Sequence, residues 1–290
     1  MPAVTVAICT RDRDRKLARA FEALLRMAVP DELTWELLVV DNASTDRTQG
    51  VIAAYSNRLP IRCVIHPVPG VSGARNVALR AARGRLLAWT DDDCVVDPLW
   101  LETIWHEFRA DPGLGGLAGL VAPAGGGQRL PAGHPGGARV ELTTDGRKLY
   151  ENLSRVATCN AAFSRDAWAR IGEFDEQLGT GTWAGSAEDW DYVYRAVRSR
   201  IRVAYCPAMV VYHHHGRHTP EELRALRRNY AVGRGAFYCK HIARGDAVAL
   251  AVACQEVRVR LAGLWRHVAG ASTWMSHLAV GAVYRVVKGA

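Results

Sequence analysis

The sequence predicts an α/β fold with a mostly parallel sheet that is flanked by helices and followed by a helical C-terminal extension. Two observations support this prediction. Short apolar runs alternate along the chain with segments whose apolar residues recur at helical spacing. The apolar runs are also nearly continuous, which is typical of strands that are buried on both faces of a parallel sheet.

Four strands are expected in the first ninety residues, and they cover residues 4–9, 35–40, 61–65 and 85–90. Helices are expected after the first strand and, behind a turn at 70–73, over 74–83. Thr10, Asp41 and Asp91 each lie just past the end of a strand. Ligands bind at the C-terminal edges of parallel strands, so these three polar loops should converge on one crevice.

The second half of the chain is less regular. Residues 113–148 hold many Gly and several Pro, which predicts a junction followed by a mobile loop. Regular structure should resume at about 157–163, with the remaining elements predicted as a helix over 189–198, strands over 201–205 and 209–212, and helices over 221–240 and 246–265.

Composition limits the class of protein. The 290 residues carry 37 Lys plus Arg against 29 Asp plus Glu, and the net charge of +8 favours anionic partners. Seven scattered Cys without a CxxC motif favour reduced thiols and a cytoplasmic protein. No secretory signal is expected, because charged residues 11–14 interrupt the start.

The C-terminal region could contact a membrane surface. Residues 268–284 carry no Asp, Glu, Lys or Arg, yet the run is short for a spanning helix. Arginines flank it, so a buried or interfacial helix that touches anionic lipid at the inner face of the membrane is one interpretation. A solvated basic face is the other.

Three consecutive carboxylates, Asp91, Asp92 and Asp93, follow the apolar run 86–90. Acidic side chains delivered to a strand edge form an oxygen-rich site that suits Mg²⁺ or Mn²⁺. Such crowded carboxylates raise one another's pKa unless a cation compensates. The alternative is an acidic turn in solvent.

These motifs together resemble family 2 inverting glycosyltransferases of the GT-A fold. The resemblance covers about the first three quarters of the chain. It rests on an ordered series of motifs: Thr10-Arg11, residues 39–46 (VVDNASTD), residues 73–76 (GARN), Asp91-Asp92-Asp93, residues 172–175 (GEFD) and residues 188–191 (EDWD).

The resemblance implies a donor site. Asp41 would accept a hydrogen bond from the imide N–H of a uracil or thymine ring, although a helix N-cap is the alternative role. Thr10, Arg11, Arg75, Asp91 and Asp92 would also contact the nucleotide sugar. Asp93, in the DxD position, would coordinate Mg²⁺ or Mn²⁺, and the ion would neutralise the leaving diphosphate.

The resemblance also implies the residues of the acceptor side. Asp189 would be the general base that takes the proton of an acceptor hydroxyl, with Glu188 as the alternative base. His213 and His215 fall where the family often has a His near the metal, and a surface cluster is the alternative. Trp183 and Trp190 could stack on an acceptor sugar, although Trp is more often a core residue.

The expected organisation is a GT-A catalytic domain over 1–220, made of a nucleotide-sugar half (1–112) and an acceptor half (113–220), and a helical extension over 221–290. The expected function is metal-dependent sugar transfer from a UDP- or dTDP-linked donor to a glycan, lipid-linked or natural-product hydroxyl. Loop 113–148 would close over that acceptor. The alternatives are a nucleotidyltransferase and a non-catalytic nucleotide- or nucleic-acid-binding protein, but no nucleic-acid module is recognisable.

Overall fold

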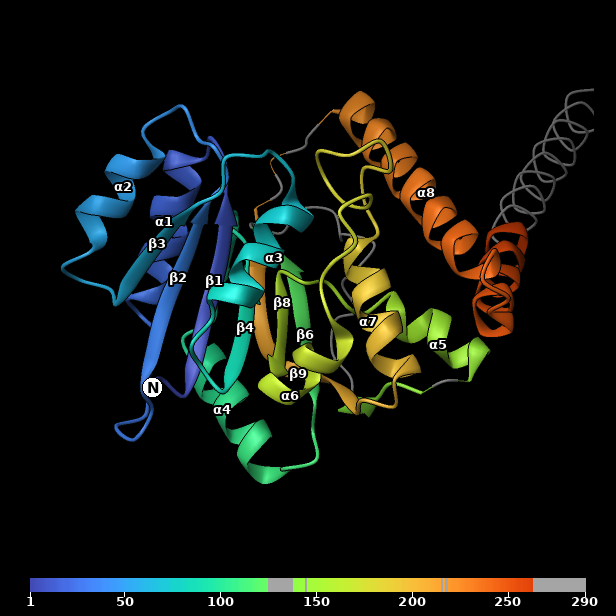
Figure 1. Cartoon of the computed structure of the whole chain (residues 1–290), viewed down its shortest axis with the longest axis horizontal. Helices are drawn as coiled ribbons and strands as arrows, with labels where there is room; N and C mark the ends of the chain where they lie inside the picture. Colours follow the sequence, from blue (N-terminus) through green and yellow to red (C-terminus); the bar gives the residue numbers. More distant parts are fainter. Residues whose placement is uncertain (125–137, 144, 215, 217–218, 263–290) are drawn as a thin grey trace, which may run out of the picture.

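The computed structural model describes residues 1–124, 138–143, 145–214, 216 and 219–262. Within them, one mixed sheet has the strand order β3-β2-β1-β4-β8-β6-β9-β5, and β7 pairs with β9 (Figure 1). The strands are β1 (Val4–Thr10), β2 (Trp35–Asp41), β3 (Ile61–Ile65), β4 (Leu86–Thr90), β5 (Cys94–Val96), β6 (Gly116–Pro123), β7 (Val140–Glu141), β8 (Asn160–Ser164) and β9 (Val203–His213).

Helices cover both faces of this sheet, which confirms the predicted α/β class. Helices α1, α2 and α4 pack on one face, and α3, α5, α6, α7 and α8 cover the other. The helices are α1 (Asp14–Leu24), α2 (Thr48–Tyr55), α3 (Val71–Ala81), α4 (Trp100–Ala110), α5 (Gly146–Leu153), α6 (Arg165–Ile171), α7 (Glu188–Arg198) and α8 (Pro220–Ile242). Residues 247–262 are also helical.

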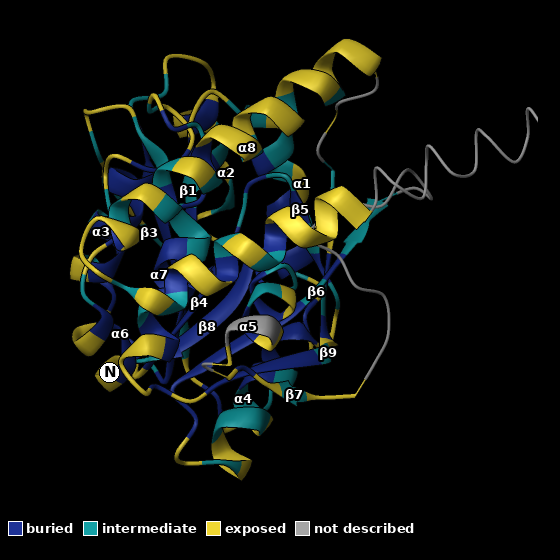
Figure 2. Cartoon of the chain, turned by 90° about the vertical axis from the view of Figure 1, so that its right-hand side faces the viewer, coloured by how far each residue is buried: buried dark blue, intermediate teal, exposed yellow. Residues whose placement is uncertain are grey.

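The central strands are apolar on both sides because each alternate residue enters a different core. In β2, Leu38 and Val40 belong to the core under α3 and α7, whereas Leu37 and Val39 belong to the core under α1 and α4. Figure 2 shows the sheet as dark blue and the outer helices as largely yellow. This double burial explains the nearly continuous apolar runs of the sequence.

Strands β3, β2, β1 and β4 pair in parallel, and so do β6 and β9. Strand β8 then runs antiparallel to both β4 and β6. The chain leaves β1 for β2 on one side and places β4 on the other side of β1. Such a change of direction opens a crevice at the C-terminal strand ends.

Three local predictions need correction. The stretch 113–148, expected as a junction and a loop, contains the interior strand β6 at 116–123, the short strand β7 at 140–141 and the first residues of α5 from 146; residues 125–137 lie outside the described residues. The strands expected at 201–205 and 209–212 are one strand, β9, which passes Pro207 where its pairing with β6 shifts register. Helix α3 begins at Val71, so the expected turn at 70–73 is mostly helix.

The C-terminal helices pack on the sheet domain, with α8 lying against α7. No helix in the described part of the chain is both long enough and apolar enough to cross a membrane. The uncharged run 268–284 lies outside the described residues.

The Asn160 side chain supplies hydrogen bonds at the point where the pairing of β6 and β9 shifts register. Its Nδ2 donates to the carbonyls of Leu120 and Met209, both at 2.9 Å, and its Oδ1 accepts the Trp100 indole N–H at 2.8 Å. Asn160 is fully buried. Removing this amide would leave buried polar groups without partners.

We therefore expect Asn160→Ala to lower the free energy of unfolding by about 2–4 kcal/mol, the cost of several unsatisfied buried groups. Urea unfolding followed by circular dichroism measures it. Asn57→Ala, at an exposed position, is the control and should change stability by less than about 0.5 kcal/mol. Equal stability of the two variants would contradict this role for Asn160.

Candidate active site

The candidate site lies at the C-terminal ends of β1, β2 and β4. Thr10 and Asp41, the last residues of β1 and β2, are neighbours in the parallel register. Asp91 follows β4 directly. The structure therefore brings the three predicted strand-end loops together.

Asp41 is fully buried, and both of its oxygens accept hydrogen bonds. The Ser44 N–H donates to Oδ1 at 3.0 Å, and the Gln49 side-chain amide donates to Oδ2 at 3.1 Å. The first residue of α2, Thr48, is instead capped by Asp46 at 2.9 Å. Asp41 is thus held rigidly without serving as the cap of α2, and a carboxylate retains further lone pairs for a ligand.

The three carboxylates of the acidic turn face three different partners. Asp91 faces Arg75 at 3.6 Å, and Asp92 accepts the Thr10 hydroxyl at 2.8 Å. Asp93 lies among cationic side chains and a histidine, with contacts to Arg13 at 3.1 Å, Lys16 at 3.2 Å and His213 Nε2 at 3.1 Å. This environment excludes the simple solvent-exposed acidic turn.

These environments separate the pKa values of Asp92 and Asp93. Burial and the adjacent Asp93 charge raise the pKa of Asp92 to about 7, against the Thr10 hydrogen bond. Burial also opposes ionisation of Asp93. There, however, the His213 hydrogen bond and the Lys16 and Arg13 charges together hold its pKa well below the usual range. Asp93 is therefore the permanently ionised carboxylate of the turn.

Arg75 of α3 joins the acidic turn to the start of α7. Its Nη1 donates to Glu188 at 2.7 Å and its Nη2 lies 3.6 Å from Asp91, while only 6% of its side chain is exposed. The guanidinium also lies over the Phe174 ring, 5.6 Å from its centroid. Burial opposes the charge, but the two carboxylates raise the pKa of Arg75 and keep it cationic.

Helix α7 begins at Glu188, after Ala187 in the left-handed conformation with φ 78°. Glu188 is engaged by Arg75. Asp189 accepts the N–H of its neighbour Trp190 at 2.8 Å. Burial and the Glu188 charge raise the pKa of Asp189 to about 7, although Arg75 opposes the shift. Asp189 can therefore gain and lose a proton near neutral pH.

The next carboxylate of this motif, Asp191, is structural. It is fully buried and contacts Arg195, Lys240 and His241 at 2.8, 2.7 and 2.8 Å. Lys240 and His241 belong to α8, so this cluster ties the first turn of α7 to α8. Sequence reasoning assigned no role to Asp191, Lys240 or His241, because nothing local indicates that they meet.

The remaining predicted residues take varied positions. Arg11 is exposed and pairs with Asp12 at 3.6 Å. His213 reaches Asp93, whereas His215 lies outside the described residues. Trp183 is 70% exposed, and Trp190 packs between Tyr150 and Phe237.

Arg13 and Lys16 lie in the candidate site, and sequence reasoning missed them. Both contact Asp93, and Arg13 also lies 3.8 Å from Asp92. They come from the loop after β1 and the first turn of α1, where charged residues are common. Their position beside the predicted ligand-binding loop was the only available signal.

Asp93 and His213 are suitable metal ligands. With Cys94 they form the group of side chains whose ligand atoms lie within 4.8 Å of one another. Burial and a hydrogen bond with Cys159 raise the pKa of the Cys94 thiol well above its ordinary value, so this thiol stays protonated. A carboxylate, an imidazole and neighbouring aspartates fit a hard divalent cation.

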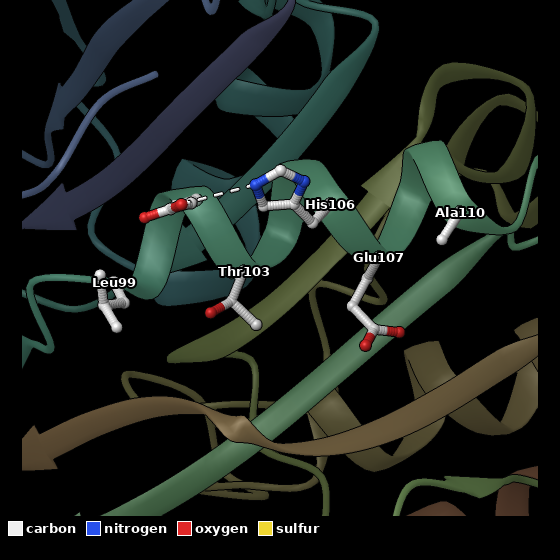
Figure 3. Close-up of a pocket in the computed structure, with 6 residues that line it drawn as sticks. Leu99, Thr103, His106, Glu107 and Ala110 are labelled. Atoms are coloured by element: carbon white, nitrogen blue, oxygen red, sulfur yellow. Dashed lines mark ion pairs between the residues drawn. The ribbon is translucent and has the colours of Figure 1, made fainter.

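Another hollow, of about 390 Å³, lies on α4 between Leu99 and Ala110 (Figure 3). The exposed His106 and the partly buried Glu102 lie 3.5 Å apart there. None of the carboxylates of the candidate site lines this hollow. We assign it no part in the site.

The chain is similar to known glycosyltransferases. Residues 5–172, more than half of the chain, match the model of glycosyl transferase family 2. Validoxylamine A glucosyltransferase of Streptomyces hygroscopicus subsp. limoneus is 34% identical over 106 residues, which cover 36% of this chain and 23% of that protein. The matched part thus spans about a quarter of that relative.

Two solved structures share the fold. TarS 1–349 from S. aureus, in complex with UDP-GlcNAc, has a TM-score of 0.66 at 19% identity, covering 87% of this chain and 72% of that one. The mannosyltransferase PcManGT from Pyrobaculum calidifontis, in complex with GDP-Man and Mn²⁺, has a TM-score of 0.55 at 19% identity, covering 90% and 81%. The family match and the shared architecture agree with the motifs: this chain belongs to glycosyl transferase family 2 and has the GT-A fold.

Proposed function

We propose that this protein transfers a sugar from a nucleoside diphosphate sugar, with UDP or dTDP as the nucleotide, to an acceptor hydroxyl with inversion at the anomeric carbon. The observation that carries the proposal is the buried Arg75 guanidinium between Asp91 and Glu188. It contacts both the acidic turn and the start of α7, which supports a single site that contains both. The nucleotide sugars held by TarS and PcManGT support this class of donor.

The donor would lie across the ends of β1, β2 and β4. Asp41 would accept the imide N–H of the base in a charge-assisted hydrogen bond. Thr10, Arg11, Asp91 and Asp92 would line the ribose and sugar. The missed cations Arg13 and Lys16 suit the diphosphate, since both lie beside Asp93 at the same edge of the sheet.

Asp189 would act as the general base. It takes the proton of the acceptor hydroxyl while that oxygen bonds to the anomeric carbon, and the bond from this carbon to the diphosphate breaks with its electron pair leaving on the diphosphate. A pKa of about 7 suits a base at neutral pH. Glu188, the alternative base, is already bonded to Arg75 at 2.7 Å, which favours Asp189.

Asp93 and His213 would hold Mg²⁺ or Mn²⁺ in this site, with Asp91 close by. When bound, such an ion supplies Lewis-acid neutralisation of the diphosphate charge. Arg75, Arg13 and Lys16 supply fixed positive charge around the same turn. We also propose, from the sequence, that His215 is a ligand of this metal.

The alternative of a nucleotidyltransferase is less well supported. Such enzymes usually carry a glycine-rich loop after the first strand, and residues 10–14 contain no glycine.

A panel of sugar nucleotides tests the proposal. Release of nucleoside diphosphate supports transfer, release of pyrophosphate from a nucleoside triphosphate and a sugar phosphate supports the alternative, and binding without release supports a non-catalytic protein.

We expect Asp189→Asn to lower kcat by roughly 10² or more with little change in donor affinity, because loss of the base affects the chemical step.

In the wild type, kcat should fall about tenfold per pH unit below the Asp189 pKa of about 7, since protonated Asp189 cannot accept a proton. Steady-state kinetics across pH measures both effects.

The matched control is Glu188→Gln. A larger loss of kcat in Glu188→Gln than in Asp189→Asn would transfer the base role to Glu188.

We expect Asp93→Ala to abolish the Mn²⁺-dependent part of UDP or dTDP binding, because it removes the ionised ligand of the turn. Calorimetry with and without chelator measures this, and circular dichroism checks the fold. Asp166→Ala is the control, because Asp166 is exposed and follows β8 at the opposite edge of the sheet. Unchanged Mn²⁺ dependence in Asp93→Ala would refute the metal assignment.

The helix over 247–262 supports peripheral contact with anionic lipid. Leu250, Val257 and Leu261 are each at least half exposed and recur at helical spacing, opposite the buried Ala249 and Val252. We expect flotation with anionic liposomes that weakens with salt, and loss of flotation in Leu250→Glu/Val257→Glu. Salt-resistant binding would indicate insertion, and absence of binding to any liposome would reject the contact.

A further inference from the structure

A hollow of about 530 Å³ lies between the loop that precedes α7 and the first half of α8. We call it the Trp183 groove. Figure 1 shows this loop beside α8, on the far side of the molecule from α1 and α2. The lining residues are Trp183, Arg224, Ala225, Arg228, Asn229 and Val232.

Trp183 is displayed on a rigid turn. The Thr182 hydroxyl donates to the Gly179 carbonyl at 2.8 Å and accepts the N–H groups of Ala184 at 3.2 Å and Gly185 at 3.3 Å. Ala184, the next residue after Trp183, is fully buried. The turn is thus anchored on both sides of an indole that is 70% exposed. A rigidly held, exposed aromatic face is well suited to stack on a sugar ring.

The wall formed by α8 is positively charged. Arg224 and Arg228 are four residues apart, so they lie on the same face of the helix and repel each other. Arg224 has an exposed ion pair with Glu221. No carboxylate in the described part of the chain pairs with Arg228. An anion bound between these guanidinium groups would relieve their repulsion.

A residue that lines the groove, Asn229, contacts the loop that leads into the candidate base. The Ser186 hydroxyl donates to the Asn229 carbonyl at 3.0 Å, and Gly233 lies so close to Ser186 that a Cβ there would meet its Oγ at 2.2 Å. Glu188 and Asp189 follow two and three residues after Ser186. A molecule in the groove therefore lies beside the loop that leads into α7.

We propose that the Trp183 groove binds the acceptor, and that this acceptor is an anionic sugar, with its ring on Trp183 and its phosphate between Arg224 and Arg228. This inference rests on the proposed function, because it names the substrate of the same site. The phosphate could belong to a soluble sugar phosphate or to a lipid-linked one, since both present the same group.

The test compares α-D-glucose 1-phosphate with methyl α-D-glucoside, which lacks the charge, by ligand-observed NMR titration of the full chain. We expect the phosphate to bind about 10-fold more tightly, as one charge-assisted contact would provide. Arg228→Gln should erase this preference, and Trp183→Ala should weaken both ligands. Arg227→Gln is the matched control, because Arg227 is exposed on α8 but does not line the groove.

Equal binding of the two probes to the wild type would overturn the proposal, as would equal effects of Arg227→Gln and Arg228→Gln. A third probe, the same glucosyl phosphate carried on a short polyprenyl chain in detergent, distinguishes the sources. Tighter binding of that probe indicates a lipid-linked acceptor, and equal binding indicates a soluble one; both support the groove.

The donor reaction is measured separately, as UDP affinity and nucleoside diphosphate release. Arg228→Gln should leave UDP affinity unchanged. If no donor releases nucleoside diphosphate, the proposed function fails and the acceptor role fails with it. A preference of the groove for the phosphate probe would then show an anion site without an acceptor role. If donors react and the groove shows no preference, only the acceptor assignment fails.

Discussion

The buried guanidinium of Arg75 is the interaction on which the geometry of the candidate site depends. A cation with only 6% of its side chain exposed is costly unless it is paired, and here Glu188 lies at 2.7 Å and Asp91 at 3.6 Å. Arg75, Glu188 and Asp91 come from α3, α7 and the turn after β4, which are far apart in the sequence. One cation thus sets the distance between the acidic turn and the candidate base.

Asp191 supplies the second anchor of the same helix. With Lys240 and His241 it binds α7 to α8, as the Arg75–Glu188 pair binds α7 to α3. Asp189 lies between these two fixed residues and has few partners of its own. Buried ion pairs contribute little net stability, and here the two clusters fix the residues on either side of Asp189, the candidate base.

Much of this arrangement could be predicted from local sequence. The β-branched and apolar runs predicted β1 to β4, because a strand buried on both faces needs apolar residues on both. Polar residues at the ends of those strands located Thr10, Asp41 and the acidic turn, because parallel strands end at one edge of the sheet. The order of these motifs identified the family that the comparisons confirm.

The sequence by itself therefore determined the α/β class, the family and the strand ends that hold the candidate site. Only the tertiary structure decided that β6, hidden in a Gly-rich stretch, runs through the middle of the sheet and that β8 reverses direction. It alone placed Arg13 and Lys16 on Asp93, and Arg228 opposite Trp183. The physical reason is that periodicity and strand-end polarity are local properties, whereas strand direction and the meeting of distant charges depend on long-range packing.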